Sequence, residues 1–98
     1  MPVIYHPDAE RELAESAQYY EERMPQLGLR FLNAVDDAVR SLAKSPRQWR
    51  VIESDVRVCV IPQFPFAIYF RSLPDMIRIL AVKHHSRNSD AWKSRLAD

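Results

Sequence analysis

Glycine, cysteine and long apolar runs are scarce in this sequence, and each scarcity excludes a class of protein. Gly28 is the one glycine, which excludes a glycine-rich phosphate-binding loop. Cys59 is the one cysteine and cannot form an internal disulfide, so a reducing cytoplasm is favoured. The apolar runs are a few residues long, far below the roughly 20 needed to cross a bilayer. We therefore expect a soluble cytoplasmic protein with no membrane anchor.

Length and charge restrict the remaining possibilities. With 98 residues, of which 47% are hydrophobic and 28% charged, the chain has the size of one domain, which we expect to span residues 1–98. The net charge of +1 excludes a strongly basic protein that holds nucleic acid by charge alone. Residues 1–45 carry five basic and eight acidic side chains (−3), whereas residues 46–98 carry nine and five (+4). An acidic partner is therefore expected to meet the C-terminal half.

The N-terminal half predicts a short strand followed by two helices. Residues 3–5 are β-branched and aromatic, as is typical of a strand. Asp8 is the expected N-cap of a first helix that ends before Pro25, and we place Gly28 with this proline in the connection. The second helix ends near Ser45, so the two helices should form an antiparallel hairpin. The apolar faces consist of Leu13, Ala17, Tyr20 and Met24 in the first helix and of Phe31, Leu32, Val35, Ala38, Val39 and Leu42 in the second.

The C-terminal half predicts three strands and a short helix. Extended patterns cover residues 56–61, 66–71 and 76–83. A short helix near the C-terminus turns Trp92 and Leu96 inward. The predicted fold class is therefore α+β, in the order strand, helix, helix and three strands, with the helical hairpin packed on one face of a mainly antiparallel sheet.

The other face of this sheet is expected to be open to a partner. In the last strand, side-chain alternation turns Ile77, Ile79 and Ala81 toward the helices. The opposite set mixes apolar and cationic side chains and is expected to be exposed: Arg78, Leu80 and Val82. Such a surface suits an amphipathic partner segment better than water. The alternative is that Arg78 is an ordinary surface residue whose stem covers apolar neighbours.

The most concentrated polar chemistry lies in residues 83–88, just past the last strand. Lys83 and Arg87 have the charge to clamp a phosphate, and His84 or His85 would supply a group that titrates near neutral pH. The segment is equally compatible with a polar loop that binds nothing. The histidines and Cys59 lack metal-ligand spacing, so we expect no metal and no cofactor. No Ser, His and Asp arrangement indicates a hydrolytic triad.

Taken together, these residues resemble the ParE/RelE superfamily of toxins from type II toxin–antitoxin modules, over nearly all of the chain. The resemblance rests on residues that follow one another in this order: Ala9, Leu13, Tyr19-Tyr20-Glu21, Leu27-Gly28, Phe31-Leu32, Pro46, Arg57, Phe64-Pro65-Phe66, Ile68-Tyr69, the strand 77–82, His84, Arg87 and Trp92. It implies the same order of helices and strands as the patterns above. It also implies a small toxin that is neutralised by an antitoxin, whose C-terminal segment drapes across the toxin and often supplies acidic and apolar side chains.

The two branches of the superfamily differ in their target. RelE-like members cut messenger RNA in the ribosome, whereas ParE-like members are described as poisoning DNA gyrase through contacts. Ribosome-dependent cutters typically have an arginine where this chain has Ala67 and a tyrosine where it has Trp92. An indole is a donor only and cannot accept a proton from a 2′-hydroxyl. The resemblance therefore favours the ParE-like branch, the plasmid stabilisation proteins, and a gyrase inhibitor that needs no catalytic residue.

We expect the cationic side chains to pair with carboxylates of the antitoxin and one aromatic to act as an anchor or a core plug. The expected partner-binding residues are Arg57, Arg71, Arg78, Lys83, His84, Arg87 and Trp92. Two alternatives stay open. One is a metal-independent endoribonuclease of the RelE type, with the ribosome and messenger RNA as partners, that uses Lys83, His84 or His85 and Arg87. The other is a toxin-like relic that has kept only partner binding.

Overall fold

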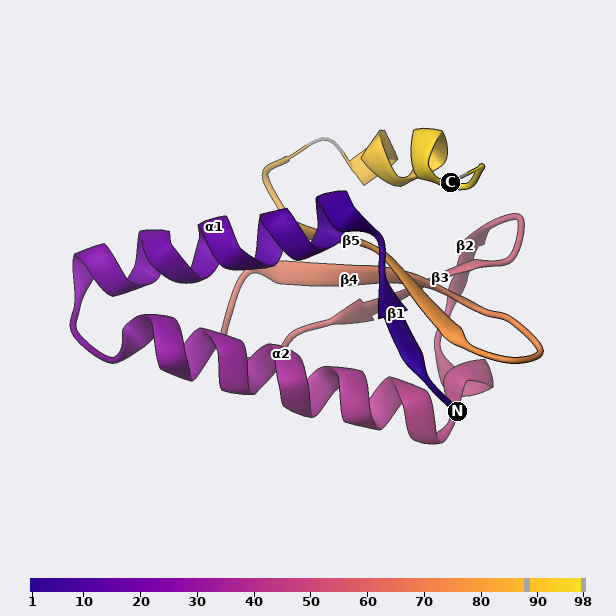
Figure 1. Ribbon diagram of the computed structural model, residues 1–98, viewed down its shortest axis with the longest axis horizontal. Helices are drawn as coiled ribbons and strands as arrows, with labels where there is room; N and C mark the ends of the chain where they lie inside the picture. The colour runs from indigo at the N-terminus through magenta and orange to yellow at the C-terminus, as the bar shows by residue number, and fades with distance from the viewer. Residues whose placement is uncertain (88, 98) are drawn as a thin grey trace.

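The computed structural model in Figure 1 describes residues 1–87 and 89–97. Strands, helices and short 3₁₀ segments alternate along the chain as follows: β1 (Val3–Tyr5), α1 (Pro7–Arg23), α2 (Leu27–Lys44), η1 (Pro46–Gln48), β2 (Val51–Glu53), β3 (Val56–Val60), β4 (Phe66–Ser72), β5 (Ile77–His84) and η2 (Ser89–Arg95).

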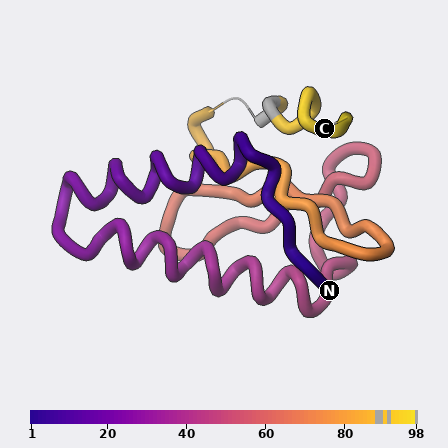
Figure 2. Tube along the Cα trace, in the orientation of Figure 1, coloured from indigo at the N-terminus to yellow at the C-terminus, as the bar shows by residue number. Residues whose placement is uncertain are grey.

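The strands form one five-stranded sheet in the order β1-β5-β4-β3-β2. β1 pairs with β5 in parallel and the other neighbours are antiparallel. The antiparallel pair of helices α1 and α2 covers one face of this sheet (Figures 1 and 2). The predicted α+β class is therefore confirmed. The sequence prediction missed β2, because a strand of three residues is too short to display an alternating pattern.

The first helix begins and ends differently from the prediction. His6, not Asp8, is the N-cap: its Nδ1 accepts the backbone N–H of Asp8 at 3.0 Å, and Pro7 occupies the first helical position. Proline is favoured there because the missing N–H would have no helical partner. Met24, expected on the buried face, follows the last helical residue in extended conformation and is 46% exposed.

Gly28 lies in the first turn of α2 and not in the connection, where Gln26 takes the left-handed conformation (φ 73°). A Cβ at position 28 would lie 2.6 Å from the carbonyl oxygen of Ala17. The glycine therefore allows α1 and α2 to approach each other closely. The carboxylate of Glu21 accepts the N–H groups of Gln26 and Gly28, each at 3.0 Å, and so satisfies two donors at the start of α2.

The main core lies between the helices and the sheet. Phe31 is fully buried and its ring packs against Tyr20, Phe64 and Phe66, with centroids 4.9–5.3 Å apart. The predicted apolar face of α2 is confirmed at Phe31, Val35, Ala38, Val39 and Leu42. Leu32, which was included in that face, is 38% exposed.

A β-bulge reverses the predicted alternation in β5. Tyr69 pairs with Ala81, but the next residue, Phe70, pairs with Ile79, so that Leu80 is an extra residue in the ladder. An extra residue turns every later side chain to the opposite face. Val82 therefore joins the core under the helices, and Ala81 joins the other face. The expectation that Leu80 and Val82 are exposed was wrong, because both are 1% exposed.

The second face of the sheet is partly covered by the chain's own C-terminal segment. Trp92 of η2 is 3% exposed and packs in a cluster with Val56, Leu80 and Ala81, against which Leu96 also packs. The inward orientation of Trp92 and Leu96 is confirmed, although η2 is a 3₁₀ helix. The expected open face is therefore not fully open.

Candidate functional site

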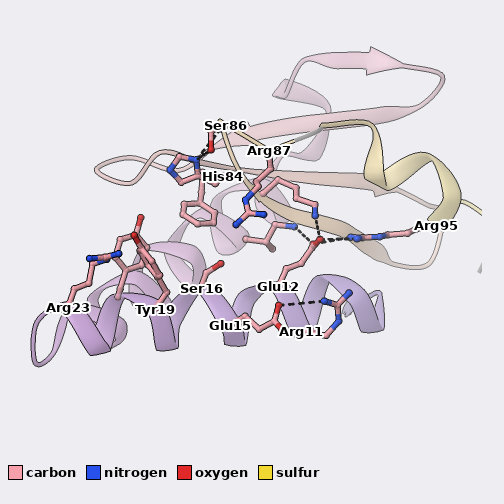
Figure 3. Close-up of a pocket in the computed structure, with 14 residues that line it drawn as sticks. Arg11, Glu12, Glu15, Ser16, Tyr19, Arg23, His84, Ser86, Arg87 and Arg95 are labelled. Carbon is pink, nitrogen blue, oxygen red and sulfur yellow. Dashed lines mark hydrogen bonds and ion pairs between the residues drawn. The ribbon is translucent and has the colours of Figure 1, made fainter.

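A groove of about 800 Å³ runs between α1 and the end of β5 with its following loop (Figure 3). We call it the cationic groove because basic side chains outnumber acidic ones along it. The basic residues are Arg11, Arg23, Lys83, Arg87 and Arg95, with His84 beside them, and the acidic residues are Glu12 and Glu15. Part of the floor is apolar and is formed by Tyr20, Phe66 and Val82.

Glu12 is the electrostatic centre of one end of the groove. Its Oε1 accepts the N–H of Val82 at 3.1 Å, and its Oε1 and Oε2 accept hydrogen bonds from Nη1 and Nη2 of Arg95 at 2.9 and 2.8 Å. Lys83 Nζ forms a further ion pair with Oε2. Burial alone would raise the pKa of Glu12, but the hydrogen bonds from Arg95, Lys83 and Val82 lower it below its ordinary value. Glu12 is therefore a fixed carboxylate whose charge the chain itself neutralises.

Arg95 joins the C-terminal segment to the rest of the fold. Besides Glu12, its Nη1 donates to the carbonyl oxygen of Leu80 at 2.8 Å, and its Nε lies 3.7 Å from Asp8 Oδ2. The side chain is 8% exposed, and hydrogen bonds to Glu12 raise its pKa. Sequence reasoning missed this pair because 83 residues separate its members, and no local pattern records a contact across that distance.

The other end of the groove carries positive charge that none of the described residues neutralises. Arg11 lies within 3.5 Å of Asp8 and Glu15. Over residues 1–87 and 89–97, by contrast, neither Arg23 nor Arg87 forms an ion pair with a carboxylate. Figure 3 shows Arg87 reaching from the loop after β5 toward α1, with Tyr19 and Arg23 farther along that helix.

His84 presents a donor to the groove. Its Nδ1 accepts the backbone N–H of Ser86 at 3.0 Å and lies 2.8 Å from the hydroxyl of the same residue. Because Nδ1 accepts from Ser86, Nε2 is the ring nitrogen left to act as a donor. The ring is held edge-on against Phe66, with centroids 5.2 Å apart. This arrangement suits recognition of an anion better than abstraction of a proton.

A model of the ParE toxin of type II toxin–antitoxin systems, parDE, matches residues 3–89 of this chain. The chain belongs to this family. A solved structure described as the chromosomal ParDE toxin–antitoxin system of P. aeruginosa has the same fold, with a TM-score of 0.76 and 23% identity over 86% of this chain and 95% of that one. No curated protein matches the sequence.

The ParE-family fold brings together only some of the residues that the sequence singled out. Lys83, His84 and Arg87 all line the cationic groove. Asn88, the last residue of that polar segment, lies outside the described residues. Trp92 is a plug in the apolar cluster of the second face and does not project into the groove. Tyr19 and Arg23 also line the groove but were not among the expected binding residues, because the pair Tyr19-Tyr20 was interpreted as a packing pair of the helix and not as a stacking platform.

Three further arginines of this ParE-family chain lie away from the groove. Arg57 donates to the carbonyl oxygens of Trp49 at 2.7 Å and of Arg47 at 3.3 Å. Arg71 forms a two-fold hydrogen bond with Asp55, with both distances at 3.0 Å, and this pairing is the largest cause of the lowered pKa of Asp55. Arg78 stands opposite Arg71 in the β4–β5 ladder. All three arginines thus have interactions within the chain itself.

The described residues give little support to a metal site, a reactive thiol or a membrane span. Across residues 1–87 and 89–97 no three His, Cys, Asp or Glu side chains are grouped as metal ligands. Cys59 is buried, and burial raises the pKa of its thiol to about 11, which leaves it unreactive at neutral pH. None of the described helices combines the length and the apolar character that a membrane span requires.

Proposed function

We propose that this ParE-family toxin is neutralised by a cognate antitoxin, and that an acidic and partly apolar segment of the antitoxin lies in the cationic groove. The observation that carries the proposal is the imbalance of charge there. Both carboxylates of the groove are already bonded within the chain, whereas Arg23 and Arg87 have no carboxylate partner among residues 1–87 and 89–97. Acidic side chains of a partner would supply the missing charge, and apolar ones would cover Tyr20 and Phe66.

We further propose that the toxin acts by inhibiting DNA gyrase through protein contact. Family membership supports a toxin, and the groove supports binding more than catalysis. Lys83 is held in an ion pair with Glu12, and the acceptor nitrogen of His84 is occupied by Ser86. A ribonuclease of this kind would need a free base, and neither Lys83 nor the Nδ1 of His84 is free in the described structure.

Neutralisation is tested by expression of the toxin alone and together with a candidate antitoxin, which a short reading frame beside the toxin gene would encode. Growth should stop with the toxin alone and recover when both proteins are made, and the two should purify together. Normal growth with the toxin alone would favour a relic that has lost its toxicity. Recovery without a stable complex would contradict neutralisation by binding.

The target is tested with purified toxin and purified gyrase. Supercoiling should fall, or cleaved DNA accumulate, as toxin is added. Primer extension on ribosome-bound messenger RNA after induction should then show no new 5′ ends. Unchanged gyrase activity at excess toxin, together with new 5′ ends, would replace the gyrase proposal with the ribonuclease alternative.

A further inference from the structure

The end of the cationic groove where the described residues leave positive charge un-neutralised combines guanidinium groups with an exposed aromatic ring. Tyr19 and Arg23 lie one helical turn apart on α1, and the guanidinium carbon of Arg23 sits 4.2 Å from the centroid of the tyrosine ring. The Tyr19 side chain is 51% exposed. His84 and Arg87 face them from the end of β5 and the loop that follows (Figure 3).

Tyr19 is not used to build the core. Its neighbour Tyr20 packs against Phe31, Phe64 and Phe66, whereas Tyr19 meets Tyr20 only edge-on, with centroids 5.6 Å apart and planes at 78°. About half of the surface of Tyr19 is exposed, so part of the ring is available to a ligand beside its contacts with Tyr20 and Arg23. The ring and the guanidinium plane therefore form a short stack that a further planar group can extend.

The hydrogen-bond donors around this stack are matched to an oxyanion. Arg87 and Arg23 supply guanidinium groups without carboxylate partners in the described residues, and the Nδ1 of His84 accepts from Ser86, which leaves Nε2 as the donor. Planar bidentate donors are especially suited to phosphate oxygens. Proteins that bind single strands of nucleic acid combine a cationic groove with an exposed aromatic side chain. The bases stack on the aromatic ring, and the phosphate backbone lies along the positive charge.

We infer that this end of the groove binds single-stranded nucleic acid, with a phosphate on Arg87 and His84 and a base stacked on Tyr19 and Arg23. This is a binding activity without cleavage, and it goes beyond the proposed function. Because the proposed antitoxin segment would occupy the same arginines, the acidic segment and the nucleic acid would exclude each other from the groove. Neutralisation would then include displacement of nucleic acid.

The test is fluorescence anisotropy of the full-length toxin with labelled oligomers of roughly 12 nucleotides, within the usual range of single-strand site sizes. The affinities for deoxythymidine and uridine oligomers of equal length are compared, to show whether the groove prefers DNA or RNA. The variants are Arg87→Ala, Tyr19→Ala and Tyr19→Phe. The matched control is Arg30→Ala, which removes the same charge from α2 outside this groove. Circular dichroism and thermal unfolding verify that each variant is folded.

We expect binding at about 50 mM salt that weakens steeply as salt is added, with Arg87→Ala reducing the slope by about 0.7 for the lost phosphate contact. Tyr19→Ala should weaken binding roughly fivefold or more, whereas Tyr19→Phe keeps the stacking ring and binds like the wild type. Arg30→Ala should stay near the wild type. The inference is overturned by an absence of binding at low salt, by equal losses for Arg87→Ala and Arg30→Ala, or by equal losses for both Tyr19 variants. None of these outcomes depends on the antitoxin or on gyrase.

Discussion

Substitution of Gly28 by alanine should destabilise the protein, although the same change usually stabilises a helix. Alanine is favoured over glycine inside a helix by up to about 1 kcal/mol. At this position, however, the new Cβ would lie 2.6 Å from the carbonyl oxygen of Ala17 and 3.0 Å from the Cβ of Glu21. A backbone oxygen cannot rotate away as a side chain can, so the two helices would have to separate.

The size of the effect follows from the cost of overpacking a close contact. Such a change typically costs about 1–3 kcal/mol. Separation of the helices would also weaken the hydrogen bonds that the Glu21 carboxylate accepts from Gln26 and Gly28. For a domain of this length each kcal/mol lowers the melting temperature by about 4–8 °C, so Gly28→Ala should melt roughly 4–24 °C lower.

Thermal and urea unfolding of Gly28→Ala measure this difference directly. The matched control is Ser41→Ala, which introduces the same residue at an exposed site on α2 and should leave the stability unchanged or slightly higher. An alanine variant at position 28 that melts at or above the wild-type temperature would refute the role assigned to this glycine.

Three further predictions concern the clusters around the sheet. Glu12→Gln should cost about 3 kcal/mol, because it leaves the buried Arg95 guanidinium with only the more distant carboxylate of Asp8, at 3.7 Å. Since the pKa of Glu12 is lowered in the folded state, the wild type should also lose stability as the pH falls below 4.5, a step that urea titrations across pH should find missing in the variant. Trp92→Ala should cost about 3–5 kcal/mol by emptying the cluster on the second face, and calorimetry that finds less than 1 kcal/mol would contradict that packing. Asp55→Asn should change the free energy of unfolding by less than about 1 kcal/mol, because the Asp55 side chain is 54% exposed and water screens its ion pair with Arg71; a larger loss in urea would contradict that assignment.

Periodicity in the sequence was sufficient for most of the fold. The helical face from Phe31 to Leu42 and the three long strands are recorded in local patterns of apolar residues, and these predictions were confirmed. The bulge at Leu80 was not predictable in this way. It depends on how β5 pairs with β4, and no residue pattern within β5 itself indicates it. One extra residue was enough to exchange the faces of Ala81 and Val82.

The part of the candidate site that lies on β5 and the loop after it was predictable from the sequence. The part that lies on α1 was not. Lys83, His84 and Arg87 stand close together in the sequence, so their chemistry was evident without a structure. Tyr19 and Arg23 become part of the same groove only because α1 packs beside β5, a contact between segments about 60 residues apart that tertiary packing alone creates.

Whether the cationic groove receives the antitoxin is tested most directly by the dissociation constant of the toxin–antitoxin complex for Arg87→Glu beside its charge-matched control Arg30→Glu. Reversal of a cation inside the groove should weaken the complex by about tenfold or more, since like charges would then face each other, whereas the control on α2 should stay within about twofold of the wild type. Equal affinities for the wild type and Arg87→Glu, in a variant that circular dichroism shows to be folded, would contradict the account.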